Sequence, residues 1–363
     1  MDCTDEDAME TARERDERLS KLDREAVLSL SGDDRLHWFS LLQVKHREME
    51  RIVEDFSHLL HPDIEATIVA MIGMTGIGKT TLARRILHAA LLKVWREKVG
   101  PTDVPYIFIE APANGERSFS WKTLYQRALK AGNEILISQK RQICLVEDRL
   151  ISLSGKSTVG ALRESLEELL KQRQVRVLVI DEAVHTLRFE EYAAVMDTLK
   201  SLANACQTKI VLIGSYDLFD LVTDHGQVMR RGEILHYKRY KSNIAADKTE
   251  FLDTVVKLQK KWPCKIIPNL AAISEELMEV TFGSVGLLKA LMLSALAAQI
   301  KSKGEKWDPK YLRKAAKSVK LFQKIREETL VGEEKLAGAT FGESLFDDED
   351  YFAAVLTKMG GAG

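Results

Sequence analysis

The sequence predicts an α/β fold, with helices on both faces of a parallel sheet, followed by an all-helical C-terminal region. Short apolar runs rich in Val and Ile, typical of strands buried on both faces, lie at 66–73, 104–112, 176–183 and 208–217. Helical stretches separate these runs, and strands that alternate with helices form parallel βαβ units. From about residue 245 onward, apolar residues recur only at helical spacing. We therefore expect a three-layer αβα core and a separate helical region.

The first strand is followed by GMTGIGKTT, whose spacing fits a phosphate-binding loop. Glycines permit positive φ angles and a close approach of the backbone to a ligand. The helix that begins at the two threonines directs its N–H groups and the positive end of its dipole at the same place. Lys79 is expected to reach the β- and γ-phosphates, and the Thr80 hydroxyl to bind Mg²⁺. The residues expected to contact the nucleotide are Gly73, Thr75, Gly76, Ile77, Gly78, Lys79, Thr80 and Thr81.

The third apolar run, RVLVIDEA, ends in two acids and supplies the second half of such a site. We expect Asp181, at the carboxyl end of the strand, to hold Mg²⁺ through water. Glu182 is then placed to orient and deprotonate the attacking water, the role of a general base in hydrolysis. The alternative is a strand that ends in two solvated acids, which is common in α/β proteins.

Two further features follow this strand. The fourth run ends at Ser215, which is expected either to face the γ-phosphate or the lytic water, or to cap the next helix. Arg230 and Arg231 precede a short strand-like run. They are predicted to act as arginine fingers that stabilise transition-state charge on the ATP of a neighbouring subunit. A basic turn is the alternative.

In this order, GMTGIGKTT, VLVIDEAVHTL, IVLIGS and MRRGEI resemble the motifs of the AAA+ ATPases. More narrowly, they resemble the TnsC/TniB/IstB-type regulators of DNA transposition, over roughly residues 35–328. The resemblance implies a P-loop AAA+ core with a helical lid, and ATP and Mg²⁺ as cofactors. It also implies a homo-oligomeric ring or helical filament on double-stranded DNA, with a transposase and a target-selector protein as partners. His185 sits where this family often has a histidine, unless it simply packs or caps there.

One departure from the initiator-type AAA+ pattern is visible in the expected lid, at TFGSVGLLKALMLSAL. Many such proteins carry a Gly-x-x-Arg sensor at the start of a helix. Here Gly286 stands where that arginine would fall, and the nearest base is Lys289. A second sensor on the lid is therefore in doubt.

Composition limits the partners and the compartment. With 53 Lys and Arg against 54 Asp and Glu, the formal net charge is −1, so any contact with DNA must be local. Cys3, Cys144, Cys206 and Cys264 form no C-x-x-C pair, which favours reduced thiols over a metal site or disulfides. No apolar run approaches a membrane span, and the first residues are too charged for a secretion signal. A cytoplasmic protein without membrane contact is expected.

Composition also divides the chain. We expect a charged extension at 1–31, a helical segment at 32–65, the nucleotide-binding core at 66–244, the lid at 245–330 and an acidic, aromatic tail at 331–363. The mixture in the tail suits a segment that folds onto a partner such as the transposase, with an incidental disordered end as the alternative. Because every expected catalytic residue precedes the tail, its removal is expected to leave ATP turnover intact.

The helix expected at 121–137 carries the best candidates for contact with DNA. Lys122, Arg127 and Lys130 share one face, and Lys140 and Arg141 follow in a loop. A few such bases per subunit would add along a ring or filament and bind with little sequence preference. An ordinary solvated helix face is an equally good interpretation of the sequence alone.

Three functions remain open. The first is a DNA-dependent AAA+ ATPase that recruits and activates a transposase. The second is a helicase-loader or initiator-type ATPase, with the same catalytic site and a different client. The third is a STAND-type signalling switch, which the phrase GMTGIGKTTLA also resembles. That class usually has a T-T-R triplet where this chain reads GSYD, and a long repeat domain for which too little chain remains.

Overall fold

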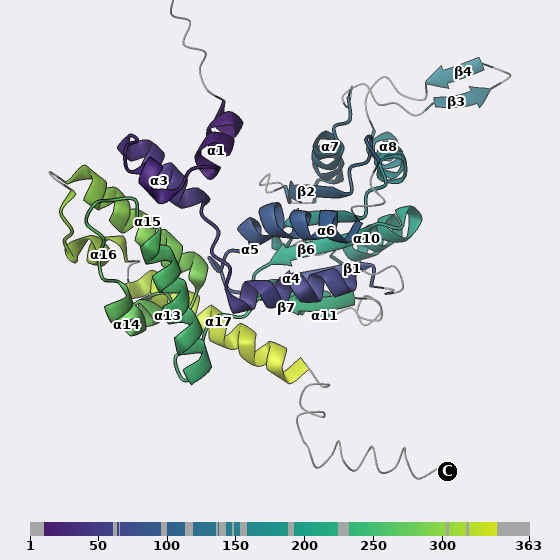
Figure 1. The fold of residues 1–363 in the computed structure, drawn as a ribbon. Helices are drawn as coiled ribbons and strands as arrows, with labels where there is room; N and C mark the ends of the chain where they lie inside the picture. The colour runs from purple at the N-terminus through teal and green to yellow at the C-terminus, as the bar shows by residue number, and fades with distance from the viewer. Residues whose placement is uncertain are drawn as a thin grey trace, which may run out of the picture. The chain divides into compact units, whose positions relative to one another are not determined.

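The computed structural model describes residues 11–60, 64, 66–95, 100–112, 119–135, 137, 143–146, 149–152, 158–187, 192–223, 232–302, 305–316 and 319–339 (Figure 1). These residues form two compact units. The helical unit contains residues 1–54, 76–78 and 237–322, and the sheet unit contains residues 55–75, 79–236 and 323–363. This division differs from the expected linear one, because the N-terminal helices group with the expected lid helices.

The sheet unit is built on five parallel strands in the order β2-β5-β6-β1-β7. Four of them correspond to the four predicted strands, and β7 to the strand-like run after the arginine pair. Their bounds are β1 (Ile68–Ile72), β2 (Tyr106–Glu110), β5 (Val177–Asp181), β6 (Lys209–Gly214) and β7 (Gly232–His236). All residues of β1 and β5 are buried, as expected for strands covered on both faces. The predicted parallel α/β core is confirmed.

Helices connect the parallel strands. The stretch predicted as one helix after β1 is α5 (Lys79–Thr81), a π-helical segment (Leu82–Leu87) and α6 (His88–Trp95). Single π-helical turns inside helices are frequent at functional sites. The other helices of this unit are α7 (Trp121–Ala131), α8 (Val159–Gln172), α9 (Val184–Leu187), α10 (Tyr192–Cys206) and α11 (Asp217–Thr223).

An antiparallel hairpin was not predicted. It consists of β3 (Ile143–Val146) and β4 (Arg149–Ser152), and it lies between α7 and α8 in the chain. The hairpin forms a two-stranded sheet separate from the five-stranded one (Figure 1). No strand was expected between the helical stretches at 121–137 and 157–173.

The helical unit packs around aromatic side chains from both ends of the chain. Phe39 meets Trp262 edge to face, with ring centroids 5.5 Å apart, and Trp262 meets Trp307 at 5.8 Å. Leu19 lies in the same core and is fully buried, so the charged N-terminal segment forms structure from residue 12 onward. The helices that lie wholly or partly in this unit are α1 (Ala12–Ser20), α2 (Arg24–Val27), α3 (Gly32–Leu41), α4 (Arg47–Leu59), α13 (Ala245–Lys260), α14 (Ser274–Val280), α15 (Val285–Lys301), α16 (Lys310–Ala315) and α17 (Val319–Ala339).

The division into units falls inside two of these helices, α4 and α17. Among the described residues, no helix alone has the length and apolar composition of a membrane span, although α14 with its preceding turn and α15, bent by 115°, pass that test as a pair.

Candidate nucleotide-binding site

The loop after β1 has the backbone that its glycines were expected to permit. Gly76 has φ +83° and Gly78 has φ +111°, a region that residues with a Cβ atom rarely adopt. A Cβ atom at Gly78 would meet no atom within 4 Å, so this part of the backbone is open to a ligand. The turn therefore offers the exposed backbone that a polyphosphate needs.

Lys79 is held at the base of this loop. Its ammonium Nζ donates hydrogen bonds to the carbonyl oxygens of Gly73, at 2.8 Å, and Met74, at 3.0 Å. Burial lowers the pKa of Lys79 to about 8, and the charges of Glu182 and Asp181 oppose that shift. A cation that is costly to desolvate gains most from a new anionic partner. The site thus favours a negatively charged ligand beside Lys79.

The two predicted magnesium ligands lie together. The Thr80 hydroxyl donates to Oδ2 of Asp181 at 2.6 Å, although the two residues are 101 positions apart in the chain. Asp181 ends β5 and is only 4% exposed. A hydroxyl and a carboxylate are the hard oxygen ligands that Mg²⁺ prefers, alongside phosphate oxygens and water. These residues fit a magnesium–nucleotide complex.

Glu182 directly follows Asp181 and has an unusual backbone. Its φ is +53°, and its own N–H donates to Oδ1 of Asp181 at 2.9 Å. Unlike Asp181, it is exposed. A non-glycine residue in this region costs on the order of 1 kcal/mol or more, and such strain gathers at functional sites. The turn directs Glu182 to solvent, as a residue that handles a water molecule requires.

The sheet order brings Ser215 beside this site. β6 pairs with β5 on one side and β1 on the other, so the strand that Ser215 follows lies between those carrying Asp181 and the P-loop. Carboxyl ends of parallel strands share one edge of the sheet. Ser215 therefore belongs to the same edge as Asp181, and both of its predicted roles remain predictions.

A contact that the sequence did not predict lies directly after Ser215. Tyr216 donates to, or accepts from, Nε2 of His236 at 3.1 Å, at the end of β7. A Cβ atom on Gly332, in α17, would be 2.1 Å from Cγ of Tyr216, so the helix backbone rests on the tyrosine ring. Lys335 donates to Oδ2 of Asp220 in α11 at 2.6 Å, and Leu336 is 5% exposed.

These α17 contacts bear on the tail. Residues 331–339 were expected to belong to a dispensable segment, but they pack on α11 within the sheet unit. A truncation that spares these contacts must begin after residue 339. The acidic and aromatic stretch itself, at 342–356, lies outside the described residues, as do Arg230 and Arg231.

The predicted DNA-contacting residues are only partly free. Lys122, Arg127 and Lys130 are all exposed on α7. However, Nη1 of Arg127 donates to the carbonyl oxygens of Glu110, at 2.7 Å, and Ala111, at 3.2 Å, where β2 ends. Part of that cation is therefore used to cap a strand. Lys140 and Arg141 lie outside the described residues.

Within the helical unit, the start of α15 contacts the turn at Gly76–Gly78. The Ser284 hydroxyl caps α15 by accepting from the N–H of Leu287 and donates to the carbonyl oxygen of Gly76, each at 3.1 Å. A Cβ atom on Gly286 would lie 2.2 Å from that same oxygen. No side chain fits at Gly286, the position where an initiator-type protein would have its arginine. Lys289, the nearest base, donates instead to the carbonyl oxygens of Ser40 and Leu42.

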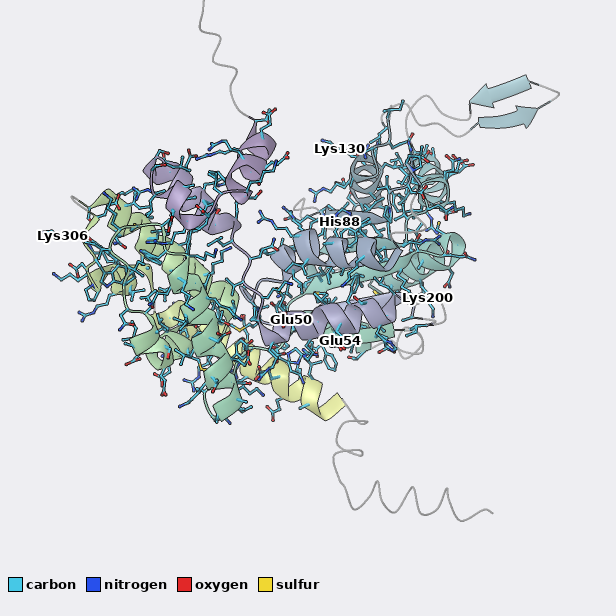
Figure 2. All side chains as sticks on the ribbon, viewed as in Figure 1. Glu50, Glu54, His88, Lys130, Lys200 and Lys306 are labelled. Carbon is cyan, nitrogen blue, oxygen red and sulfur yellow. The ribbon has the colours of Figure 1, made fainter. Side chains whose placement is uncertain are left out.

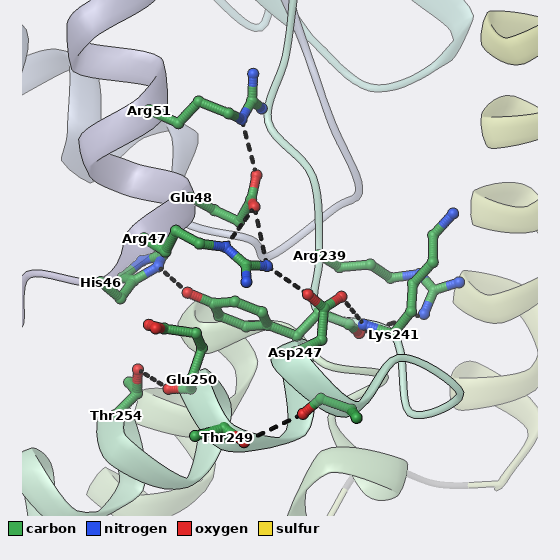
Figure 3. Close-up of polar contacts among 12 residues, drawn as sticks. His46, Arg47, Glu48, Arg51, Arg239, Lys241, Asp247, Thr249, Glu250 and Thr254 are labelled. Atoms are coloured by element: carbon green, nitrogen blue, oxygen red, sulfur yellow. Dashed lines mark hydrogen bonds and ion pairs between the residues drawn. The ribbon is translucent and has the colours of Figure 1, made fainter. Parts of the chain in front are cut away.

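A buried polar cluster joins the segment before α4 to the segment after β7 (Figure 3). Nδ1 of His46 lies 3.1 Å from the Tyr240 hydroxyl, and Nε2 lies 3.2 Å from the Tyr237 hydroxyl. Arg47 binds Asp247, whose other oxygen accepts from the N–H of Lys241 at 2.7 Å. Burial lowers the pKa of His46 to about 4, so the ring is neutral at pH 7. The sequence had indicated only that this region leads into the core.

Comparisons with known proteins concern the fold that carries these residues. Residues 63–222 match the family described as AAA domain. Cdc6p from Pyrobaculum aerophilum has a similar structure, with TM-score 0.50 and 14% identity, covering 80% of this chain and 70% of that chain. The Aeropyrum pernix Orc1 protein, solved in complex with DNA, is similar with TM-score 0.54 and 16% identity. The match covers 81% of this chain and 68% of that chain. No curated protein sequence matches. Residues 63–222 are thus similar to the AAA domain family, and at these identities the likeness to the two structures concerns the fold alone.

Proposed function

We propose that this protein is an ATPase of the initiator or helicase-loader type, which hydrolyses ATP to act on double-stranded DNA. The observation that carries the proposal is the hydrogen bond of 2.6 Å between Thr80 and Asp181, with Lys79 beside them. It supports a site in which a cation that binds phosphate, a hydroxyl and a carboxylate act together. The likeness of the fold to Cdc6p and Orc1 favours DNA as the client.

Each residue of the site has a separate task in this proposal. Lys79 and the N–H groups of the loop hold the β- and γ-phosphates, while Thr80 and Asp181 hold Mg²⁺. When bound, the ion neutralises charge on the phosphate oxygens. Glu182 takes a proton from the attacking water, and Ser215 orients that water or the γ-phosphate. Removing the base should slow the reaction without loosening the nucleotide.

The test compares two substitutions, one expected to affect ATP hydrolysis and one expected to affect ATP binding. Glu182→Gln is expected to keep ATP affinity and lose most hydrolysis, because the phosphate and Mg²⁺ contacts survive. Lys79→Ala is expected to weaken binding itself. Titration with a fluorescent nucleotide measures ATP affinity. Phosphate release, with and without duplex DNA, measures hydrolysis. If Glu182→Gln hydrolysed ATP at the wild-type rate, Glu182 would not be the base.

Assembly gives a further test of the same proposal. If Arg230 or Arg231 acts on the ATP of a neighbouring subunit, its alanine variant should bind ATP normally and hydrolyse it poorly. Mixing that variant with Glu182→Gln should restore some turnover, because mixed interfaces bring an intact base to an intact arginine. Absence of rescue at every mixing ratio would assign the arginine pair a structural role.

Regulation of DNA transposition is the second candidate. It is supported by VIDEAVHTL and by Gly286, whose close approach to Gly76 leaves no room for a lid arginine. In this version the protein forms a ring or filament on target DNA and recruits a transposase and a target selector. Electron microscopy with duplex DNA and a non-hydrolysable ATP analogue should then show spirals wrapped on the DNA. Single rings around DNA, which recruit a replicative helicase, would favour the loader.

A further inference from the structure

A basic surface lies on the helical unit, apart from the nucleotide-binding residues. Residues 301–322, the last part of this unit, carry eight Lys and Arg against two acids, Glu305 and Asp308, a net charge of +6. Because the whole chain has a net charge of −1, the other residues together carry −7. The positive charge of this protein is therefore concentrated in one short part of the sequence.

Packing adds a second basic segment to the first. Trp307 lies against Trp262, with ring centroids 5.8 Å apart. The Gln299 side chain joins the same segments, because its Nε2 donates to the carbonyl oxygens of Ile266, at 2.8 Å, and Glu305, at 2.9 Å. Lysines at 260, 261 and 265 are thereby held next to the bases that follow α15.

We call the resulting set the lid basic surface, and its members share three properties. All are exposed, all lie in the helical unit, and none makes an ion pair with a residue that the structure describes. Figure 2 labels Lys306, one of them, at the outside of this unit. The members are Lys260, Lys261, Lys265, Lys301, Lys306, Lys310, Arg313 and Lys314.

The acids nearby do not neutralise this surface. Both oxygens of Glu305 accept hydrogen bonds from Arg35, at 3.0 and 2.5 Å. That pairing lowers the pKa of Glu305, so the carboxylate is ionised and already matched by another cation. Asp308 accepts from the N–H of Lys310 at 2.8 Å, at the start of α16. The excess of positive charge is therefore left for a partner.

Helix α16 shows what kind of partner fits. Lys310, Arg313 and Lys314 are spaced i, i+3 and i+4, so they share one exposed face. Tyr311 and Leu312 pack toward the core on the other side. Like charges at this spacing repel by a few tenths of a kcal/mol per pair, a cost that a bound polyanion removes. The α16 face itself has charge and no apolar anchor, whereas peptide recognition uses grooves or pockets for side chains. Ile266 and Ile267, 44% and 42% exposed, adjoin Lys265 in the other segment, so the acidic peptide is the competing partner to test.

We propose that the lid basic surface binds the phosphate backbone of double-stranded DNA. Seven of its eight members are lysines, which bind phosphates as point charges without reading bases. The inference rests on the proposed function, because it names the surface by which that ATPase would hold its DNA. It places the main contact on the helical unit and not on α7, where the sequence had suggested it.

The test is a charge-neutralising triple variant of the full chain, Lys310→Gln, Arg313→Gln and Lys314→Gln. Binding of a fluorescent duplex of about 30 base pairs is followed by anisotropy over a series of salt concentrations, with a saturating ATP analogue. We expect a loss of affinity of about tenfold or more, and a salt slope reduced by up to about 2.7, since each phosphate contact contributes about 0.9. The matched control replaces three exposed lysines elsewhere, Lys45→Gln, Lys93→Gln and Lys171→Gln, and should change affinity less than about twofold.

A second variant, Lys260→Gln, Lys261→Gln and Lys265→Gln, should give a loss of the same kind, because both groups belong to one surface. An unchanged salt slope in both variants, or an equal loss in the control, overturns the proposal. A polyglutamate peptide that binds the wild type more tightly than DNA, and is lost in the first variant, also overturns it and identifies an acidic protein partner. If the triple variant loses DNA while the wild type shows no ATP turnover, the proposed function fails and this inference stands.

Discussion

His46 should make the stability of the helical unit depend on pH. The imidazole is 6% exposed and has pKa about 4, against 6.5 for an exposed histidine. Its two ring nitrogens meet the hydroxyls of Tyr240 and Tyr237, and Lys257 adds a smaller electrostatic contribution that also lowers the pKa. Arg47, near Tyr240, adds a further positive charge to this cluster. No described acid bonds to the ring, so protonation is opposed by burial and by like charge.

The direction and size follow from linkage. Between the folded pKa, about 4, and the unfolded pKa of 6.5, the unfolded chain binds the proton and the folded chain does not. The free energy of unfolding should therefore fall as the pH drops through this window. From pH 7 to pH 5 the loss is about 2 kcal/mol, out of about 3.4 kcal/mol for the full shift. For a unit of this size, that corresponds to a melting temperature lower by about 4 to 8 °C.

Thermal unfolding of His46→Gln and wild type at pH 7 and pH 5 checks this reasoning. Glutamine keeps a donor and an acceptor but does not titrate, so the variant should lose most of the difference between the two pH values. His58→Gln is the matched control, because His58 is exposed and lies on α4, the helix that follows His46. If His46→Gln and wild type showed the same pH dependence, the buried neutral imidazole would not be its source.

Two glycine contacts give further predictions. Gly286→Ala should weaken nucleotide binding and destabilise the protein by about 1 to 3 kcal/mol, because the added atom would meet the carbonyl oxygen of Gly76 at 2.2 Å. Nucleotide titration and thermal unfolding measure this, and unchanged affinity would contradict the contact. Gly332→Leu should displace Tyr216, destabilise the sheet unit by a similar amount and lower ATP turnover. The exposed neighbour Val331→Ala is its control, and equal turnover in both variants would separate α17 from the site.

The strands and the chemistry of the site could be predicted because each depends on the residue types in a short stretch of sequence. A strand buried on both faces must be apolar throughout, so the run at 66–73 predicted β1 (Ile68–Ile72) to within two residues. The proximity of Thr80 and Asp181 could be inferred for a similar reason, since a magnesium–phosphate site requires a hydroxyl and an acid at the same edge of the sheet, here on two strands separated by β6. The chemical type of the residues limited the candidates for this site more than their spacing in the sequence did.

The end of α7 shows a signal that was present and overlooked. The helix was expected to reach residue 137, but it ends at Ala131, and Asn133 then adopts φ +61°. Gly-Asn at this point is a common stop for a helix, because both residues tolerate left-handed backbone. This signal predicts a helix that ends near Gly132, as the structure has it. The hairpin itself was hard to identify, since four-residue apolar strands resemble parts of a buried helix.

Contacts between distant segments could not be predicted from local patterns. Gly286 and Gly332 both lie within helices, α15 and α17, where glycine costs about 1 kcal/mol relative to alanine. That cost indicates a reason to keep each glycine, but the sequence does not reveal that the reasons are the oxygen of Gly76 and the ring of Tyr216. The lid basic surface is similar, because the contacts that join its two basic segments, between Trp262 and Trp307 and through Gln299, link residues far apart in the sequence.

The backbone at Glu182 has a consequence for how this protein could change over generations. Because Glu182 has φ +53°, glycine or asparagine at this position would lower the conformational free energy of the folded chain by on the order of 1 kcal/mol. Substitution of Glu182 by glycine or asparagine is therefore expected to stabilise the fold and to remove the proposed base. A descendant released from the need to hydrolyse ATP would drift to a more stable, nucleotide-holding form. Under the proposed mechanism, the acid at this position is kept for turnover, against the preference of the backbone.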